Sequence, residues 1–232
     1  MIFMHRARLA ILSQPKTGTT ALEKSLSLRA SMTIHGPPEL KHVSYRGFMR
    51  DFAPLIESHT GLKRSEYLVV AAMREPLDWL GSWYRYRTRG KLLKKNHPRS
   101  HNYTGEISYE EFARQVSSSG ADRPSYAEVK TPSWVSLAHR DCIGVDRLFP
   151  YEDLSGLYAL IEERSGKPPE PDQLNVSPDM ELTLSEEALA LIRGKFRFDF
   201  DLHTSLSKDG MVDERFRVWT DTGEAEDYSS GV

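Results

Sequence analysis

The stretch from Ser13 to Thr20 constrains the fold more than any other part of the chain, because it joins two patterns of different period. Residues 7–12 read Ala-Arg-Leu-Ala-Ile-Leu and predict a short buried strand, whereas a helical pattern begins at Ala21. A strand, a glycine-containing loop and a helix in this order direct backbone N–H groups and the positive end of the helix toward an anion. We therefore predict a loop that binds a phosphate-like group.

This loop departs from the Walker pattern G-x-x-x-x-G-K-[ST], in which a lysine follows the second glycine. Gly18 and Thr20 match the second glycine and the final hydroxyl residue, but Ser13 replaces the first glycine and Thr19 replaces the lysine. Lys16, which precedes the glycine, is the only lysine in the loop. The sequence therefore favours an anion other than ATP with magnesium.

The composition is that of a globular protein, with 232 residues of which 39% are hydrophobic and 28% charged. We expect one domain over residues 1–221 and an acidic, flexible tail over 222–232. The net charge of −2 argues against a chain-wide nucleic-acid surface, and the single cysteine, Cys142, excludes an internal disulfide. No apolar run approaches the roughly 20 residues that span a membrane, and the N-terminus does not resemble a secretory signal. We expect a cytoplasmic protein with no nucleic-acid or membrane partner.

Strand-like and helix-like segments alternate in the N-terminal half, which predicts an α/β fold with a small, mainly parallel sheet flanked by helices. Helical segments dominate after residue 75, so we expect a helix-rich C-terminal half. Strands are predicted over 7–12, 67–73 and 146–151, and helices over 46–58, 76–89, 109–116, 154–164 and 185–196. Loop-like composition marks 31–47, 90–108 and 117–132.

A second anchor for an anion follows the strand at 67–73, which ends in Met73-Arg74-Glu75-Pro76. In open parallel sheets, ligands bind beyond the carboxyl ends of the strands, and this is where Arg74 is expected. Ser82 follows about two helical turns later, so its hydroxyl can converge with the guanidinium group on a second phosphate. Taken alone, Arg74 could equally pair with a carboxylate and Ser82 with a packed neighbour.

The two segments SQPKTGTTALEKSL and MREPLDWLGSWYRYR together resemble the sulfotransferases that use 3′-phosphoadenosine 5′-phosphosulfate (PAPS). The similarity is close over residues 7–90, and the family that it indicates includes bacterial and carbohydrate-type members. It implies a P-loop-like three-layer fold, release of 3′-phosphoadenosine 5′-phosphate (PAP) and no metal. It also implies that Tyr151-Glu152-Asp153-Leu154 matches a YEDL segment of many members, for which we favour a structural role.

The resemblance implies a role for each residue of the two segments. Donor binding falls to Pro15, Lys16, Thr17, Gly18, Thr19 and Thr20 for the 5′-phosphosulfate, and to Arg74 and Ser82 for the 3′-phosphate. Lys16 is expected to offset charge on the oxygen that bridges phosphate and sulfate. Gly18 allows the backbone to approach the phosphate.

The acceptor must lose a proton, and histidine is the usual base near neutral pH. The resemblance points to His42, which follows the first strand–helix unit, as the catalytic base. His35 and Glu39 remain alternatives. Lys41, next to His42, is assigned either to the acceptor site or to a solvated surface.

The run from Arg85 to Arg99 contains seven Lys or Arg residues and no acidic residue. It predicts either a solvated face or a region that recognises an anionic acceptor, such as an acidic saccharide. Aromatic residues precede it and overlap its start, and we expect at least two of them to pack in the core: Trp79, Trp83, Tyr84 and Tyr86.

The sequence alone therefore predicts a sulfotransferase, with two other classes open. One is a divergent P-loop kinase, and the other is a non-catalytic module that binds an anionic polymer through the basic run. Sugars, lipids, phenols and peptides all remain possible acceptors, because a fold does not specify a substrate. The oligomeric state is likewise open.

Overall fold

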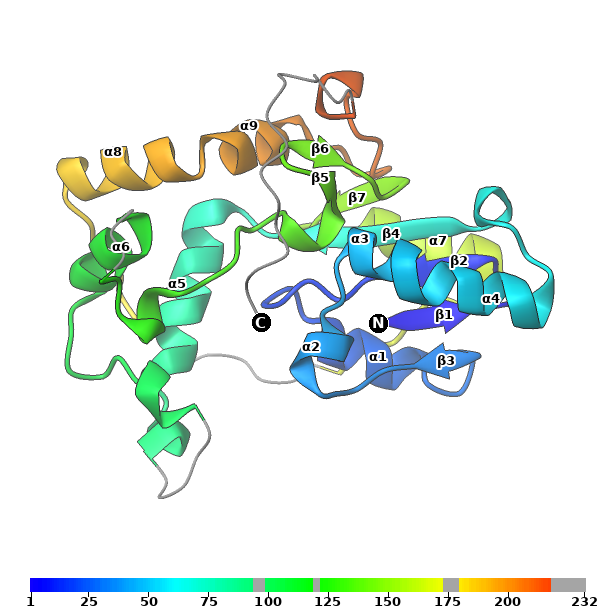
Figure 1. The fold of residues 1–232 in the computed structure, drawn as a ribbon, viewed down its shortest axis with the longest axis horizontal. Helices are drawn as coiled ribbons and strands as arrows, with labels where there is room; N and C mark the ends of the chain where they lie inside the picture. The colour runs from blue at the N-terminus through cyan, green and yellow to red at the C-terminus, as the bar shows by residue number, and fades with distance from the viewer. Residues whose placement is uncertain (94–98, 119–121, 173–179, 218–232) are drawn as a thin grey trace.

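A computed structural model describes residues 1–93, 99–118, 122–172 and 180–217. Its centre is a five-stranded sheet in the order β3-β1-β2-β4-β7 (Figure 1). The strands are β1 (Ile2–Met4), β2 (Leu9–Ile11), β3 (Met32–Thr33), β4 (Leu68–Met73) and β7 (Arg147–Pro150). A separate two-stranded sheet joins β5 (Leu137–His139) to β6 (Cys142–Ile143).

The sheet is mixed, so the expectation of a mainly parallel sheet is wrong. β2 pairs in parallel with β4, and β4 with β7, but β1 runs antiparallel to both β2 and β3. The antiparallel strand arises because residues 2–4 fold back on residues 9–11 through a tight turn. This turn is closed by a hydrogen bond from the Arg8 N–H to the His5 carbonyl (3.1 Å), and Arg8 takes a positive φ of 48°.

Alternating side chains of the strands pack against helices on both faces of the sheet. Ile11 and Val70 face α1 (Thr19–Leu26) and α7 (Ser155–Ser165). Ala10 and Val69 face the opposite cluster, which includes side chains of the π-helical turn Phe48–Phe52, α4 (Ala53–Thr60) and α9 (Arg197–Ser205). This two-sided burial explains why the strands read as nearly continuous apolar runs.

A helical lobe lies beside the sheet and is built from α5 (Pro76–Arg87), α6 (Tyr109–Ser117) and α8 (Glu186–Lys195) (Figure 1). These helices share a third core cluster, in which Trp79 and Phe112 are fully buried. Ser108 and Ser185 cap α6 and α8 through side-chain oxygens. α5 connects the lobe to the sheet, because it starts three residues after β4 ends.

The main predicted strands and helices are present, with ends shifted by a few residues. The expected helix over 46–58 is instead divided into α3 (Tyr45–Gly47), the π-helical turn and α4, since Pro54 cannot donate a hydrogen bond to the preceding turn. Residues 31–47, expected to be a loop, also contain β3 and α2 (Pro38–Lys41). The predicted tail at 222–232 lies outside the described residues.

Single 3₁₀ turns complete the described structure: Arg64–Glu66, Gly90–Leu93, Ser100–Asn102, Ser125–Ala127, Trp134–Ser136 and Glu214–Phe216. Within the described ranges, no helix has the length and apolar character needed to cross a membrane.

Gly156 on α7 provides a test of this packing. A Cβ atom at this position would clash with the backbone carbonyl oxygen of Lys208. We expect Gly156→Ala to destabilise the protein by about 1–3 kcal/mol, because neither backbone segment can move aside without disturbing the core. Thermal unfolding measures the effect, at about 2–4 °C per kcal/mol for a chain of this size.

Gly194→Ala is the matched control, since a Cβ atom there meets nothing within 4 Å. Alanine favours the helix at this position, so this variant should gain up to about 1 kcal/mol. An equal rise in melting temperature for both variants would contradict the packing of α7 against the segment around Lys208.

Candidate functional site

A cleft of about 1000 Å³ lies at the carboxyl ends of β2, β4 and β7. The loop after β2 leads into α1, and the end of β4 leads into α5 (Figure 1). All nine residues predicted for the site line this one cleft: Pro15, Lys16, Thr17, Gly18, Thr19, Thr20, His42, Arg74 and Ser82. Long-range pairing of the strands thus joins segments nearly 60 residues apart in the sequence.

The glycine turn is fixed by its own backbone conformation. Lys16 and Gly18 both have positive φ, at 71° and 64°, and Gly18 is the N-cap of α1. A side chain at Gly18 would also crowd the ring of Tyr151, with a Cβ atom 3.3 Å from its Cε2. The Thr17 hydroxyl donates to the Gln14 carbonyl (2.8 Å) inside the loop. The first N–H groups of α1 lack partners in the preceding turn and are available to an anion.

Arg74 connects the second anchor to the glycine turn. Its Nη1 donates to the carbonyl oxygen of Lys16 (3.1 Å), and its Nε donates to Asp78 Oδ2 (2.6 Å). The guanidinium group lies over the Tyr151 ring, 4.9 Å from its centroid. Ser82, one helical turn beyond Asp78, is buried along the same cleft. Asp78 partly neutralises Arg74 and holds it in place.

The Lys16 side chain lies against two aromatic rings of α5. Its Nζ is 4.4 Å from the centroid of Tyr86 and 5.5 Å from that of Trp83. Burial, together with the neighbouring positive charges of Arg89, Arg74, Arg85 and Arg87, lowers the pKa of Lys16 to about 7. The Lys16 amino group therefore lies among several positive charges, and a bound polyanion would stabilise its charged form.

The other two aromatic residues of that segment, Trp79 and Tyr84, are buried in the helical lobe. This confirms the prediction that at least two of the four would pack in the core. Trp83 and Tyr86 line the cleft instead.

His42 follows α2 and is held by a hydrogen bond between its Nδ1 and the Ser13 carbonyl oxygen (2.6 Å). A carbonyl oxygen only accepts, so Nδ1 carries the proton and Nε2 of the neutral ring keeps its lone pair. Burial lowers the pKa of His42, which favours this neutral form. Neither alternative base, His35 or Glu39, lines the cleft, and the His35 side chain is 66% exposed.

The basic run between Arg85 and Arg99 does not form one solvated face. Arg85, Arg89 and Arg99 line the cleft. Arg87 is buried against the ring of Trp83, and burial lowers its pKa to about 10. Residues 94–98 of the run lie outside the described ranges. The residues of the run therefore lie in different environments, and a count of charges in the sequence does not distinguish them.

Some residues that line the cleft were not predicted as site residues from the sequence. Tyr151 packs beside Gly18 and Arg74, so the YEDL segment contributes to the wall of the cleft. Glu152 accepts from the Glu75 N–H (2.8 Å) and contacts His203 (3.0 Å), which fits the structural role favoured above. Lys41 lines the cleft as well, and its side chain is only 13% exposed, so it does not lie on a solvated surface.

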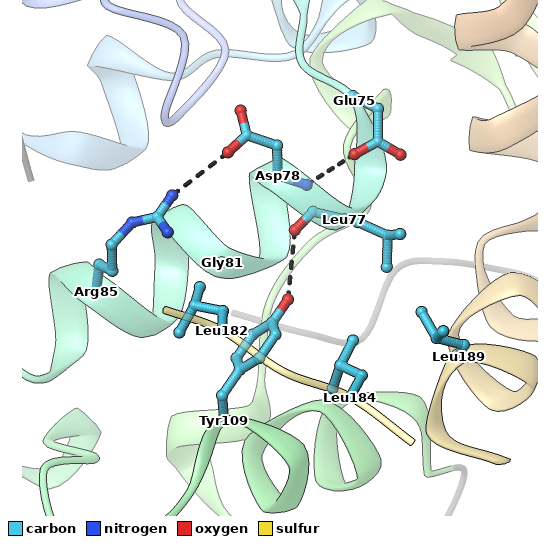
Figure 2. Close-up of a pocket in the computed structure, with 9 residues that line it drawn as sticks. All are labelled: Glu75, Leu77, Asp78, Gly81, Arg85, Tyr109, Leu182, Leu184 and Leu189. Atoms are coloured by element: carbon cyan, nitrogen blue, oxygen red, sulfur yellow. Dashed lines mark hydrogen bonds and ion pairs between the residues drawn. The ribbon is translucent and has the colours of Figure 1, made fainter. Parts of the chain in front are cut away.

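A second cavity, of about 430 Å³, lies between α5, the start of α6 and the segment that leads into α8 (Figure 2). Its walls are mainly apolar: Leu77, Leu182, Leu184, Leu189 and the ring of Tyr109. Its polar groups are used within the fold, since the Tyr109 hydroxyl donates to the Leu77 carbonyl (3.4 Å) and Arg85 pairs with Asp78 (3.3 Å). Arg85 lines both cavities.

Comparison of the chain with models of known families, with curated proteins and with solved structures finds no match. In the described part of the chain, no group of three or more His, Cys, Asp or Glu residues is arranged to hold a metal ion. The geometry of the cleft is therefore the feature of this chain that bears on its function.

Proposed function

We propose that this chain is a PAPS-dependent sulfotransferase with a P-loop-like fold, which transfers a sulfuryl group to a hydroxyl or amine acceptor and releases PAP. The observation that carries the proposal is the hydrogen bond between Arg74 and the Lys16 carbonyl, which unites two separate anion-binding segments in one cleft. A donor with phosphate groups on the 3′ and 5′ oxygens of one ribose requires two such anchors at a fixed separation.

The chemistry of the lining suits this donor. The first N–H groups of α1 and the hydroxyls of Thr19 and Thr20 would bind the 5′-phosphosulfate, while Arg74 and Ser82 would bind the 3′-phosphate. Among the described lining residues, Asp172 is the single carboxylate, whereas several Lys and Arg side chains are present. The volume is at the upper end of the range for small-molecule sites, which leaves space for an acceptor beside the donor.

The proposed reaction is an in-line displacement at sulfur. The acceptor oxygen or nitrogen forms a bond to sulfur as the bond from sulfur to the bridging phosphate oxygen breaks, and that oxygen keeps the electron pair. His42 Nε2 takes the acceptor proton. The Lys16 ammonium group offsets the charge that develops on the leaving oxygen. A sulfuryl group carries less charge than a phosphoryl group, so protein donors suffice and no metal is required by this scheme.

Ligand-dependent stability separates this proposal from a divergent kinase. PAP at 100 times its Kd should stabilise the protein by about 2.7 kcal/mol, or roughly 5–10 °C in melting temperature. ATP with magnesium should give a smaller shift, because Thr19 stands where a kinase loop has its lysine. Differential scanning fluorimetry of the full chain with each ligand provides the measurement.

Arg74→Leu should abolish most of the rise in melting temperature that PAP causes. Arg6→Leu, at an exposed arginine that does not line the cleft, should leave this rise unchanged. A large shift with ATP–magnesium and none with PAP would favour the kinase instead.

Turnover then requires labelled PAPS and a panel of acceptors: an acidic saccharide, a neutral sugar, a phenol and a tyrosine peptide. Acceptor-dependent release of PAP supports catalysis, whereas binding of PAP and of an anionic polymer without release would favour the non-catalytic module. A strong rise of acceptor KM with salt would indicate an anionic acceptor, because screening weakens the attraction to Arg85 and its neighbours.

A further inference from the structure

Glu23 of α1 is a buried carboxylate beneath the cleft that the proposed reaction does not use. Its side chain is 1% exposed, and a carboxylate is tolerated there only with strong partners. Its Oε1 accepts from the Ser13 hydroxyl (2.7 Å) and from the amino group of Met1 (3.1 Å), and its Oε2 pairs with Lys41 Nζ (2.9 Å). Burial raises the pKa of Glu23, but the hydrogen bonds from Ser13 and Lys41 outweigh it, so the pKa is lowered and the group is ionised.

Two partners of Glu23 lead directly to the cleft. Lys41 Nζ also donates to the Thr20 hydroxyl (2.9 Å). The carbonyl of Ser13 accepts the hydrogen bond from His42 Nδ1 (2.6 Å) that fixes the tautomer of the ring. Thr20, Lys41 and His42 all line the cleft, whereas Glu23 does not. One carboxylate thus connects the anion-binding helix, the loop before it and the segment that carries the base.

The helix that precedes the base contributes little apolar packing. α2 spans only four residues, contains no buried side chain and lies against α1 (Figure 1). Its Leu40 is largely exposed, so apolar packing contributes little to its position. Polar contacts of Lys41 and His42 therefore position the imidazole ring, together with the buried Val43 that follows it and the hydrogen bond from the Met1 amino group to the Lys41 carbonyl (3.1 Å).

We infer that Glu23 is a positioning residue for the transfer site, acting through Lys41 on Thr20 and through Ser13 on His42. This inference rests on the proposed function for its effect on turnover, but its effect on the His42 ring is independent of any activity. Charged groups that face Glu23 are Lys41, the Met1 amino group and the exposed His35, whose Nδ1 is 3.6 Å away.

Two substitutions should move the pKa of His42 in opposite directions. Glu23→Gln removes a negative charge and leaves the positive charges of Lys41 and Met1 uncompensated, so the pKa of His42 should fall. Lys41→Met removes a positive charge, so the pKa should rise. Nitrogen NMR of the full-length protein across pH reports both the pKa and the Nδ1–H tautomer. The change of charge alone shifts the pKa but leaves the Nδ1–H tautomer in place, so a loss of that tautomer in Glu23→Gln is the readout specific to positioning.

Turnover provides the second readout. Both variants should lose about tenfold in kcat, because the base and the Thr20 hydroxyl lose their alignment. Glu162→Gln on α7, which is exposed and is not among the residues that line the cleft, is the matched control and should behave as wild type. The acid limb of kcat/KM should follow the NMR pKa of His42 in each variant.

Shifts of opposite sign together with a loss of the Nδ1–H tautomer support the inference even if no acceptor is ever sulfated, in which case the proposed function alone fails. If folded Glu23→Gln and Lys41→Met keep the wild-type His42 titration and tautomer, the inference is overturned. Lys41→Met keeps the test decisive should Glu23→Gln not fold, because an unchanged His42 titration in that variant would also overturn it.

Discussion

Replacing Lys16 with methionine is expected to lower turnover by about 10²-fold or more, the cost of removing a donor that acts in the transition state. Methionine keeps most of the length and apolar contact of the side chain, so packing against Trp83 and Tyr86 should persist. The variant loses only the ammonium group that would offset charge on the leaving oxygen. Kcat at saturating PAPS measures the effect, with circular dichroism and melting temperature as checks on folding.

Lys41→Met makes an informative comparison, because that lysine also lines the cleft but is paired with Glu23. It should cost much less in kcat than Lys16→Met. Turnover of a folded Lys16→Met protein near the wild-type rate would remove Lys16 from the mechanism.

The lowered pKa of Lys16 adds a pH signature to the same prediction. Burial and the surrounding arginines bring this pKa to about 7, so in the free protein the ammonium form is lost as the pH rises through that value. The kcat/KM for PAPS, which reports the free protein, should therefore fall above about pH 7. The negative charges of bound donor raise the lysine pKa again, so kcat should stay high to a more alkaline pH. The alkaline limb of kcat/KM should be absent in Lys16→Met.

Local patterns account for the parts of the fold that the sequence predicted. The run at 67–73 is apolar throughout because β4 is buried on both faces, and Pro76 begins α5 because a first helical turn needs no N–H there. β1 was missed since a strand of three residues carries too little pattern, and its pairing depends on the turn at 5–8. The mixed character of the sheet follows from that one hairpin.

The residues of the candidate site also fall into two groups, those that belong to local motifs and those that come together only in the fold. The glycine turn and the Arg74 segment are local motifs, so their residues could be named in advance. Contacts between segments that are distant in the sequence could not be predicted, since no local pattern encodes them. Examples are Tyr151 against Gly18, Lys16 on the rings of α5, and Glu23 with Lys41. The fate of Arg87 shows the limit clearly, because it belongs to a charged run and is nevertheless buried.

His42→Ala is the second prediction with a large expected effect, a loss of about 10²–10⁴-fold in kcat for removal of a general base. PAP should bind to the variant as it does to the wild type, because the anion-binding turn and Arg74 are untouched. The acid limb of the kcat/KM profile should disappear with the imidazole. In the wild type this limb lies below the ordinary pKa of histidine, about 6.5, since burial lowers the pKa of His42.

Two companion variants decide which group is the base. His35→Ala and Glu39→Gln should retain nearly full kcat, because both side chains lie outside the lining of the cleft. Added imidazole should restore part of the activity of His42→Ala by entering the space that the ring leaves, and it should do nothing for the other two. Loss of turnover in His35→Ala together with normal turnover in His42→Ala would transfer the role to His35, and would require α2 to rotate from the position that Glu23 and Ser13 give it.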